Sequence, residues 1–267
     1  MPSYRFCRPD DIPFLVRAVN ECWAPHFPGT PPMTVESFRR EMRELDLWPS
    51  SSMVAADDDT AVAVLTGTKR EEETLISRIG VRPGETGKGH GGHLVTSLSQ
   101  KLAVLGPPRL VTEVPGELAG ACRFFEGLGW RREASFRDWA REAGGAVEPV
   151  PEGLALPASV AELAEAAALA VPEGAAWLRT RKTLMNRREG LLGLAVASPD
   201  RIEAWLAFDP EAPDGAAEVV GLGAAEGARR ELLLGGLLRR LIAAAAGQRV
   251  RLARLAEAEL SANLLTG

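Results

Sequence analysis

The sequence has few cysteines and lacks the paired spacing that metal sites and disulfide frameworks use. Its three cysteines, Cys7, Cys22 and Cys122, form an odd set, and no CxxC occurs among the 267 residues. A disulfide framework or a structural zinc site is therefore not expected. We predict buried, reduced thiols instead, as is common for free cysteines in cytoplasmic proteins.

The sequence also lacks an excess of basic residues and a long hydrophobic segment. Its 31 Lys and Arg against 36 Asp and Glu give a net charge of -5, which argues against non-specific nucleic-acid binding. The longest apolar stretch, residues 232–246, is interrupted by glycines and arginines and falls short of the ~20 residues of a membrane span. With no signal-peptide pattern at the start, we expect a cytoplasmic protein without membrane or nucleic-acid partners.

What the sequence does contain is an ordered series of strand and helix patterns. Hydrophobic residues make up 46% and charged residues 25%, which are ordinary values for a globular protein. Spacing of the apolar residues predicts the following elements in the first half: a strand at 4–7, helices at 12–23 and 34–45, a hairpin of 53–56 and 61–68, a strand at 75–81, a helix at 94–105, a strand at 110–114, a helix at 119–128 and a final strand at 130–139.

The second half repeats this order after a segment rich in Gly and Pro. We therefore predict a first domain at 1–142, a linker at 143–157 and a second domain at 158–267. The elements predicted in the second domain are helices at 160–169 and 176–188, strands at 191–197, 202–208 and 218–222, a helix at 229–246, a strand at 250–255 and a helix from 257. A repeat period above a hundred residues indicates duplicated domains and not a solenoid.

A glycine-dense turn links the strand at 75–81 to the helix that follows it. It runs from Gly84 through Gly87-Lys88-Gly89-His90 to Gly91-Gly92. Glycines let a backbone approach an anion closely, and a helix N-terminus adds partial positive charge. A pyrophosphate fits such a turn, with Lys88 adding a charge-assisted contact.

Two familiar phosphate loops do not match this turn. A Walker A loop needs Ser or Thr after its lysine, where Gly89 stands. A dinucleotide-binding GxGxxG would open a βαβ unit and be followed by an acidic strand end about 20 residues on, whereas this turn follows two helices and a β-meander.

The residues around the turn resemble the GNAT superfamily of acetyl-CoA-dependent N-acyltransferases. In that family an aliphatic-x-Val-x-Pro strand end leads into (Arg/Gln)-x-x-Gly-x-(Gly/Ala), and the strand 79–83 and the loop 86–91 match this pattern, except that Thr86 replaces the Arg or Gln. The resemblance implies acetyl-CoA as cosubstrate, with its pantetheine arm along the strand and its pyrophosphate in the loop. The implied cofactor-binding residues are Ile79, Gly80, Val81, Gly87, Lys88, Gly89, His90, Gly91, Gly92 and Phe124.

A second motif lies at the family's expected distance downstream. Residues 121–130, Ala-Cys-Arg-Phe-Phe-Glu-Gly-Leu-Gly-Trp, resemble its Ala-x-x-(Phe/Leu)-Tyr-Glu-x-x-Gly-(Phe/Trp) segment. The resemblance covers about residues 4–140. It implies an α/β (α+β) fold built as two tandem GNAT-like units, each a mixed, mostly antiparallel sheet flanked by helices, with the second unit incomplete.

Acetyl transfer needs a group that takes the amine proton and a donor for the oxyanion. The family's oxyanion donor is a backbone N–H, here near Gly80 or Val81. Its acid is often a Tyr, where this sequence has Phe125, and the single tyrosine is Tyr4 in the first strand. The proton-transfer apparatus is therefore moved or missing.

Few residues remain as a base. Glu113 ends the strand at 110–114, facing the gap where substrate and cofactor meet in the family, and we predict it as the catalytic base; a solvated strand end is the alternative. Glu117 is a further candidate for the base. Cys122 could reach the same site, with a packed thiol as the default, and His26 could line the amine site, with a surface histidine as the alternative.

No metal site is predicted. His90 and His93 are three residues apart at a helix start, but no third ligand is visible. The Asp run at 57–59 fits a solvated hairpin turn.

The second domain is predicted to be degenerate. Aligning Val81 with Leu222 puts Ala228, Arg230 and two leucines where the glycines of the loop stand, and the run 263–267 ends before a closing strand. The predicted function is N-acetylation of a primary amine of a small molecule or peptide by the first domain, with a homodimer as an assembly. The alternative is a non-catalytic acyl-CoA-binding sensor or scaffold.

Overall fold

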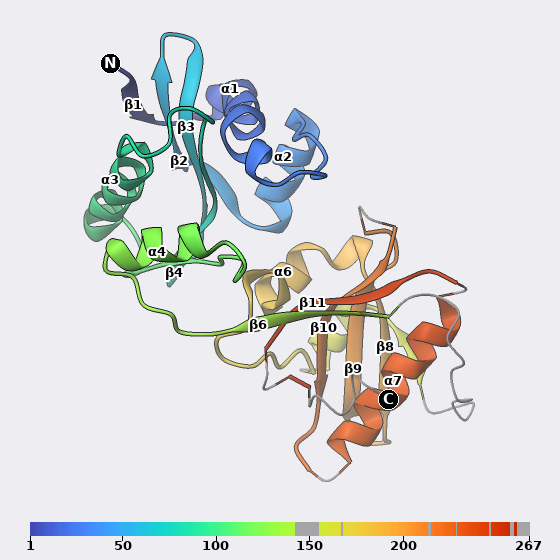
Figure 1. The fold of residues 1–267 in the computed structure, drawn as a ribbon. Helices are drawn as coiled ribbons and strands as arrows, with labels where there is room; N and C mark the ends of the chain where they lie inside the picture. Colours follow the sequence, from blue (N-terminus) through green and yellow to red (C-terminus); the bar gives the residue numbers. More distant parts are fainter. Residues whose placement is uncertain are drawn as a thin grey trace. The chain divides into compact units, whose positions relative to one another are not determined.

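The chain divides into two compact units, residues 1–131 and 132–267, each with its own sheet and hydrophobic cores (Figure 1). The computed structural model describes residues 1–141, 155–166, 168–212, 215–227, 229–245, 247–256 and 259–260. Within these residues no helix is long and apolar enough to cross a membrane.

The first unit is built on a five-stranded sheet in the order β1-β2-β3-β4-β5. Its strands are β1 (Ser3–Phe6), β2 (Leu47–Asp57), β3 (Thr60–Lys69), β4 (Glu73–Val81) and β5 (Arg109–Thr112). The first four pair antiparallel, whereas β4 and β5 are parallel because α3 (His90–Leu105) crosses between them. Asp58, with φ 51°, turns β2 into β3, so the aspartate run is a hairpin turn as predicted.

Helices cover both faces of this sheet. On one face lie α1 (Ile12–Ala18), its continuation η2 (Val19–Trp23) and α2 (Val35–Glu44), packed on strands β2 and β3. On the other face α3 and Phe125 of α4 (Ala119–Gly127) pack together, while η1 (Pro9–Asp11) and η3 (Ala24–His26) flank α1 and η2.

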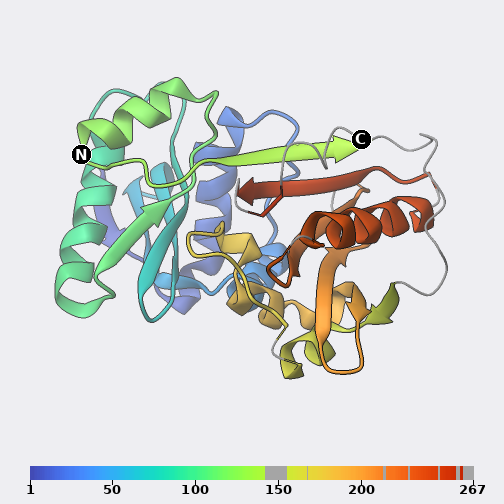
Figure 2. The same ribbon diagram turned by 90° about the horizontal axis from the view of Figure 1, so that it is seen from below.

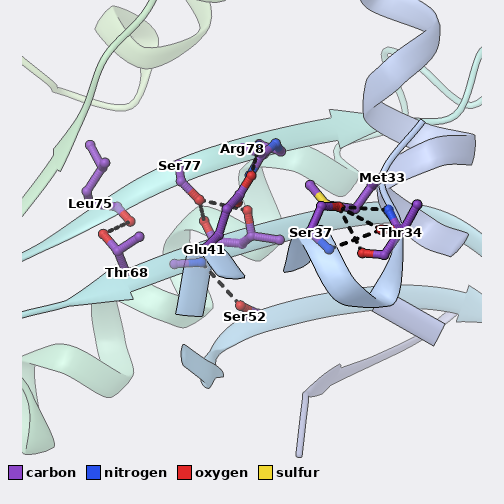
Figure 3. Close-up of polar contacts among 11 residues, drawn as sticks. Met33, Thr34, Ser37, Glu41, Ser52, Thr68, Leu75, Ser77 and Arg78 are labelled. Carbon is purple, nitrogen blue, oxygen red and sulfur yellow. Dashed lines mark hydrogen bonds and ion pairs between the residues drawn. The ribbon is translucent and has the colours of Figure 1, made fainter. Parts of the chain in front are cut away.

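Local chemistry fixes the start of α2 and the state of two thiols. The Thr34 side chain accepts from Ser37 N at 3.0 Å, and Ser37 Oγ accepts from Thr34 N at 2.9 Å (Figure 3), which confirms the predicted N-cap. Cys7 and Cys22 are buried and free, as predicted. Burial raises the pKa of Cys7 to about 12 and that of Cys22 to about 11, so both stay protonated at neutral pH.

The second unit repeats the same plan on six strands, in the order β6-β11-β10-β9-β8-β7. Only β10 and β11 are parallel, and helix α7 crosses between them. The elements are β6 (Phe136–Arg141), β7 (Leu156–Ala158), α5 (Val160–Glu165), η4 (Trp177–Arg179), α6 (Arg181–Asn186), η5 (Arg188–Gly190), β8 (Leu192–Ala197), β9 (Ile202–Asp209), β10 (Ala217–Ala224), α7 (Arg230–Ala244) and β11 (Val250–Ala256).

Strand β6 departs from the prediction. The strand expected at 130–139 as the end of the first domain starts later and pairs antiparallel with β11 in the second sheet (Figure 2). The division at 131–132 therefore precedes the predicted boundary at 142. β6 also gives the second sheet the closing strand that its own half was expected to lack. Residues 142–154, which include most of the predicted linker, and the run 261–267 lie outside the described residues.

Candidate functional site

A β-bulge in β4 ends its pairing with β5. Ile76 faces Gly67 and Arg78 faces Thr66, which leaves Ser77 as the extra residue. Ser77 Oγ donates to Thr66 O at 3.1 Å and lies 2.8 Å from Thr66 Oγ1 (Figure 3). The β4–β5 register stops at Ile76, directly before the bulge, while β4 continues to Val81. Because a bulge bends its strand, β4 leaves β5 at this point.

The backbone of Ile79 and Val81 faces the edge that β5 has left. Arg82 N donates to Val62 O on β3 at 2.9 Å. In a trans peptide the preceding carbonyl, Val81 O, points the opposite way, and antiparallel pairing alternates along the strand. Gly80 therefore turns its N–H toward β3. Of the two predicted oxyanion donors, Val81 N–H faces the open edge and Gly80 N–H does not.

Gly80 instead allows a helical segment to press against β4. A Cβ at Gly80 would lie 2.4 Å from Cys22 O and 2.6 Å from Trp23 Cα, closer than real side chains approach. This packing brings His26 to the open edge, where its Nε2 lies 2.8 Å from Val81 O. A carbonyl only accepts, so Nε2 carries the hydrogen.

The glycine loop forms an open turn at the start of α3. Gly84, Gly87 and Gly89 have φ values of 88°, 79° and 86°, in the left-handed region that favours glycine. A Cβ on any of these three would meet nothing within 4 Å, so the loop surface is clear. Gly91 differs, because its Cβ would lie 3.3 Å from the Phe124 ring. Its bare backbone lets Phe124 pack beneath the loop.

Polar side chains gather at this turn. Lys88 Nζ donates to Glu85 Oε2 at 2.8 Å, and His90 Nε2 lies 3.8 Å from the same oxygen. His90 is 7% exposed, and its Nδ1 is 2.6 Å from Tyr4 Oη. His93 lies against the Tyr4 ring, with centroids 3.9 Å apart. Both histidines thus contact Tyr4. The residues that the structure describes include no group of three potential metal ligands.

The comparison with protein families agrees with this geometry. The model of the Acetyltransferase (GNAT) family matches residues 15–130. The match to this family thus covers nearly all of the first unit and less than half of the chain. No match was found among curated proteins.

Solved GNAT structures extend the likeness to nearly the whole chain. A GCN5-related N-acetyltransferase from Sphaerobacter thermophilus is 19% identical over 94% of this chain and 85% of its own, with a TM-score of 0.62. A putative acetyltransferase from Pyrococcus horikoshii is 16% identical over 94% and 79%, with 0.56. The glucosamine N-acetyltransferase region of a fungal GH3 β-N-acetylglucosaminidase is 13% identical over 96% and 35%, with 0.68. These identities show the fold alone, and they confirm the predicted two-unit α/β architecture.

The first unit holds an apolar residue at the position where the resemblance implies an acid. Phe125 is 6% exposed, and its ring lies 4.9 Å from Trp130 and 5.0 Å from Phe124. It therefore packs the core and offers no proton. Glu113 directly follows Thr112, whose Oγ1 donates to Ile76 O at 3.1 Å. Glu113 thus lies at the point where the two parallel strands separate. Its role as base stays a prediction.

The sequence did not predict an ion pair that lies beside the bulge of the first unit. Arg78 donates to both carboxylate oxygens of Glu41 at 2.7 Å (Figure 3), and its guanidinium lies 5.2 Å from the Trp23 ring centre. Arg78 lies on β4, and nothing in the local sequence indicates a partner for it on α2. The ion pair therefore links α2 to β4 directly beside the bulge at Ser77.

The second unit has the same bulge but no open edge. Val219 faces Phe208 and Gly221 faces Ala207, so Val220 is extra, as Ser77 is in the first unit. Matching the two bulges aligns Val81 with Ala224, which corrects the predicted alignment with Leu222. The turn before α7 spans only 225–229, against 82–89 before α3, so the cradle is lost by shortening. Ala228 lies outside the described residues.

A buried ion pair fills the place where β10 and β11 separate. Arg179 Nη1 donates to Val219 O on β10 at 2.9 Å and to Ala253 O on β11 at 3.3 Å. Its other nitrogens bond Glu259 at 2.6–3.0 Å, and both side chains are 1% exposed. Arg230 Nη1 donates to Ala224 O at 2.7 Å. A buried guanidinium and its carboxylate partner thus occupy this place in the second unit, where the first unit has no such pair among its described residues.

Proposed function

We propose that the first unit transfers the acetyl group of acetyl-CoA to a primary amine of a small molecule or a peptide. One observation carries this proposal: beyond its bulge β4 no longer pairs with β5, and the edge so freed of a neighbouring strand leads directly into the open glycine turn at the start of α3. Backbone N–H groups of an extended edge and of a helix N-terminus suit an amide-containing arm and a pyrophosphate.

The residues of the chain fit this cosubstrate. Ile79 and Val81 would pair with the pantetheine arm, and the backbone from Gly87 to Gly92 would cradle the pyrophosphate. Gly80 and Phe124 support this site by packing, because one admits the helical segment and the other lies under Gly91. Acetyl-CoA supplies an activated thioester when bound.

The backbone and one carboxylate would carry the chemistry. An N–H fixed toward the open edge, at Ile79 or Val81, stabilises an oxyanion without reorganisation. Glu113 would take the amine proton, directly or through water. Because Phe125 cannot act as an acid, and general acid catalysis is typically worth about 10²–10⁴-fold, we expect slow turnover of generic amines.

A test on the full chain separates the enzyme from its rival, a non-catalytic acyl-CoA sensor or scaffold. Release of free thiol from acetyl-CoA would be followed with a panel of small amines and peptides. Thiol release that depends on one class of amine supports the enzyme and names its acceptor. Calorimetric binding of CoA without any amine-dependent thiol release would favour the sensor. A homodimer is a further prediction, which sedimentation of the full chain would test.

A further inference from the structure

The basic side chains around the glycine turn each face a carboxylate of the same chain. Arg82 bonds Glu21, and Lys88 Nζ lies 2.8 Å from Glu85 Oε2. His90 Nε2 lies 3.8 Å from that same Glu85 oxygen. The positive charges that would meet a pyrophosphate are therefore matched by the chain itself.

The backbone of Glu85 is fixed within the turn by a hydrogen bond. Its backbone N–H donates to Arg82 O at 2.9 Å, which closes the turn after β4. His90 beneath it is buried and fixed by Tyr4, so one ring nitrogen is directed at the Glu85 carboxylate. The carboxylate thus stands between two donors of the loop, Lys88 and His90.

An anionic ligand at this turn would compete with the Glu85 carboxylate for Lys88. A carboxylate and a pyrophosphate both accept hydrogen bonds from Lys88, and they repel one another as like charges. Glu85 has 35% and Lys88 56% of its side chain exposed, and exposed ion pairs are weak. A pyrophosphate can therefore displace Glu85, but its affinity is reduced by the competition. Lys88 is the main cause of the lowered pKa of Glu85, which agrees with a charged carboxylate at neutral pH.

We infer that Glu85 limits the affinity of this site for CoA by competing with the pyrophosphate for Lys88. The inference rests on the proposed function, because it concerns the same cofactor site. It makes Glu85 the residue of the loop that discriminates between ligands: those with a pyrophosphate meet the competition, whereas a bare pantetheine arm does not.

The test is a double-mutant cycle in the full chain, with CoA affinity measured by calorimetry. Glu85→Gln keeps the shape and removes the charge, and it should bind CoA about three- to tenfold more tightly, as expected for one removed charge near a polyanion. Lys88→Gln should bind more weakly. In the Lys88→Gln background, adding Glu85→Gln should change affinity by less than half as much, on a logarithmic scale, as it does in the parent.

Two controls make the outcomes decisive. Glu72→Gln removes an equal charge from the exposed β3–β4 turn, at the other end of β4, and should leave CoA affinity unchanged. S-acetylpantetheine, which has no pyrophosphate, should bind the parent and Glu85→Gln equally. If the parent binds CoA but Glu85→Gln binds it no better, or gains equally with and without Lys88, the competition is rejected while the proposed function stands. If no folded variant binds CoA, both are rejected.

Discussion

Glycines of the first unit have several different structural roles. In the sequence they are visible only as a dense cluster, which does not separate these roles. Gly87 and Gly89 adopt left-handed backbone with open space around them, whereas Gly91 and Gly80 are bare because a ring and a helical segment approach them. The motif was readable because phosphate turns need consecutive glycines. The role of Gly80 was not, because its neighbours Cys22 and Trp23 lie far away in the sequence.

Gly89→Glu tests the turn directly. It adds a side chain and a negative charge at the N-terminus of α3, and CoA affinity should fall at least tenfold, about 1.4 kcal/mol. Gly29→Glu is the matched control, because Gly29 also has positive φ (88°) and no neighbour within 4 Å of its Cβ. It imposes the same backbone strain and charge away from the turn. Calorimetry that found equal CoA affinity in both folded variants would contradict the site.

Glu113→Gln tests the predicted base. It keeps the shape of the side chain and removes its basicity, so kcat/KM for the true acceptor should fall at least about tenfold while CoA affinity is unchanged. Glu117→Gln, on the exposed segment that follows, is the comparison variant and distinguishes the two candidate carboxylates. Parent-like kinetics in Glu113→Gln would make Glu113 a solvated strand end.

At the scale of elements, the alternation of apolar residues predicted every strand of both sheets except β7, but not the two bulges. A bulge shifts the inward–outward alternation beyond it by one residue, but in strands this short the shift is not distinguishable from irregular spacing, so Ser77 and Val220 look like ordinary strand positions. The missed feature mattered, because it separates β4 from β5 and sets the alignment of the two halves. Pairing partners such as Glu41 for Arg78 are equally invisible, since α2 and β4 are distant in sequence.

Breaking the Arg179–Glu259 pair on one side should strongly destabilise the second unit. Arg179→Met leaves a buried carboxylate without its partner, which typically costs about 3–5 kcal/mol. The double variant Arg179→Met/Glu259→Leu removes both charges and should recover much of that loss. Urea unfolding would measure both, with Arg188→Met as control, because Arg188 faces Glu189 at 4.0 Å in an exposed pair worth about 0–1 kcal/mol. A loss below about 1 kcal/mol in Arg179→Met would overturn this expectation.

For the whole molecule, the order of elements was predictable but the assignment of one strand was not. Residues 136–141 have a pattern that suits either sheet, and the choice of β11 as partner depends on edges formed by distant parts of the chain. The Gly- and Pro-rich segment at 143–157 predicted a domain boundary where the composition of the chain changes. The units divide earlier, before β6, because strand pairing decides which residues belong together.

Binding stoichiometry is the prediction that belongs to this scale. The full chain should bind one CoA, because among the described residues the first unit alone combines an edge that its neighbouring strand has left with a glycine turn. In the second unit, the buried Arg179–Glu259 pair fills the place where β10 and β11 separate, and the turn before α7 is shorter. Calorimetry should therefore give one site per chain, and Gly89→Glu should weaken binding at that site. A second CoA per chain would contradict the filled edge, since a pantetheine arm would have to displace a buried guanidinium from two strands.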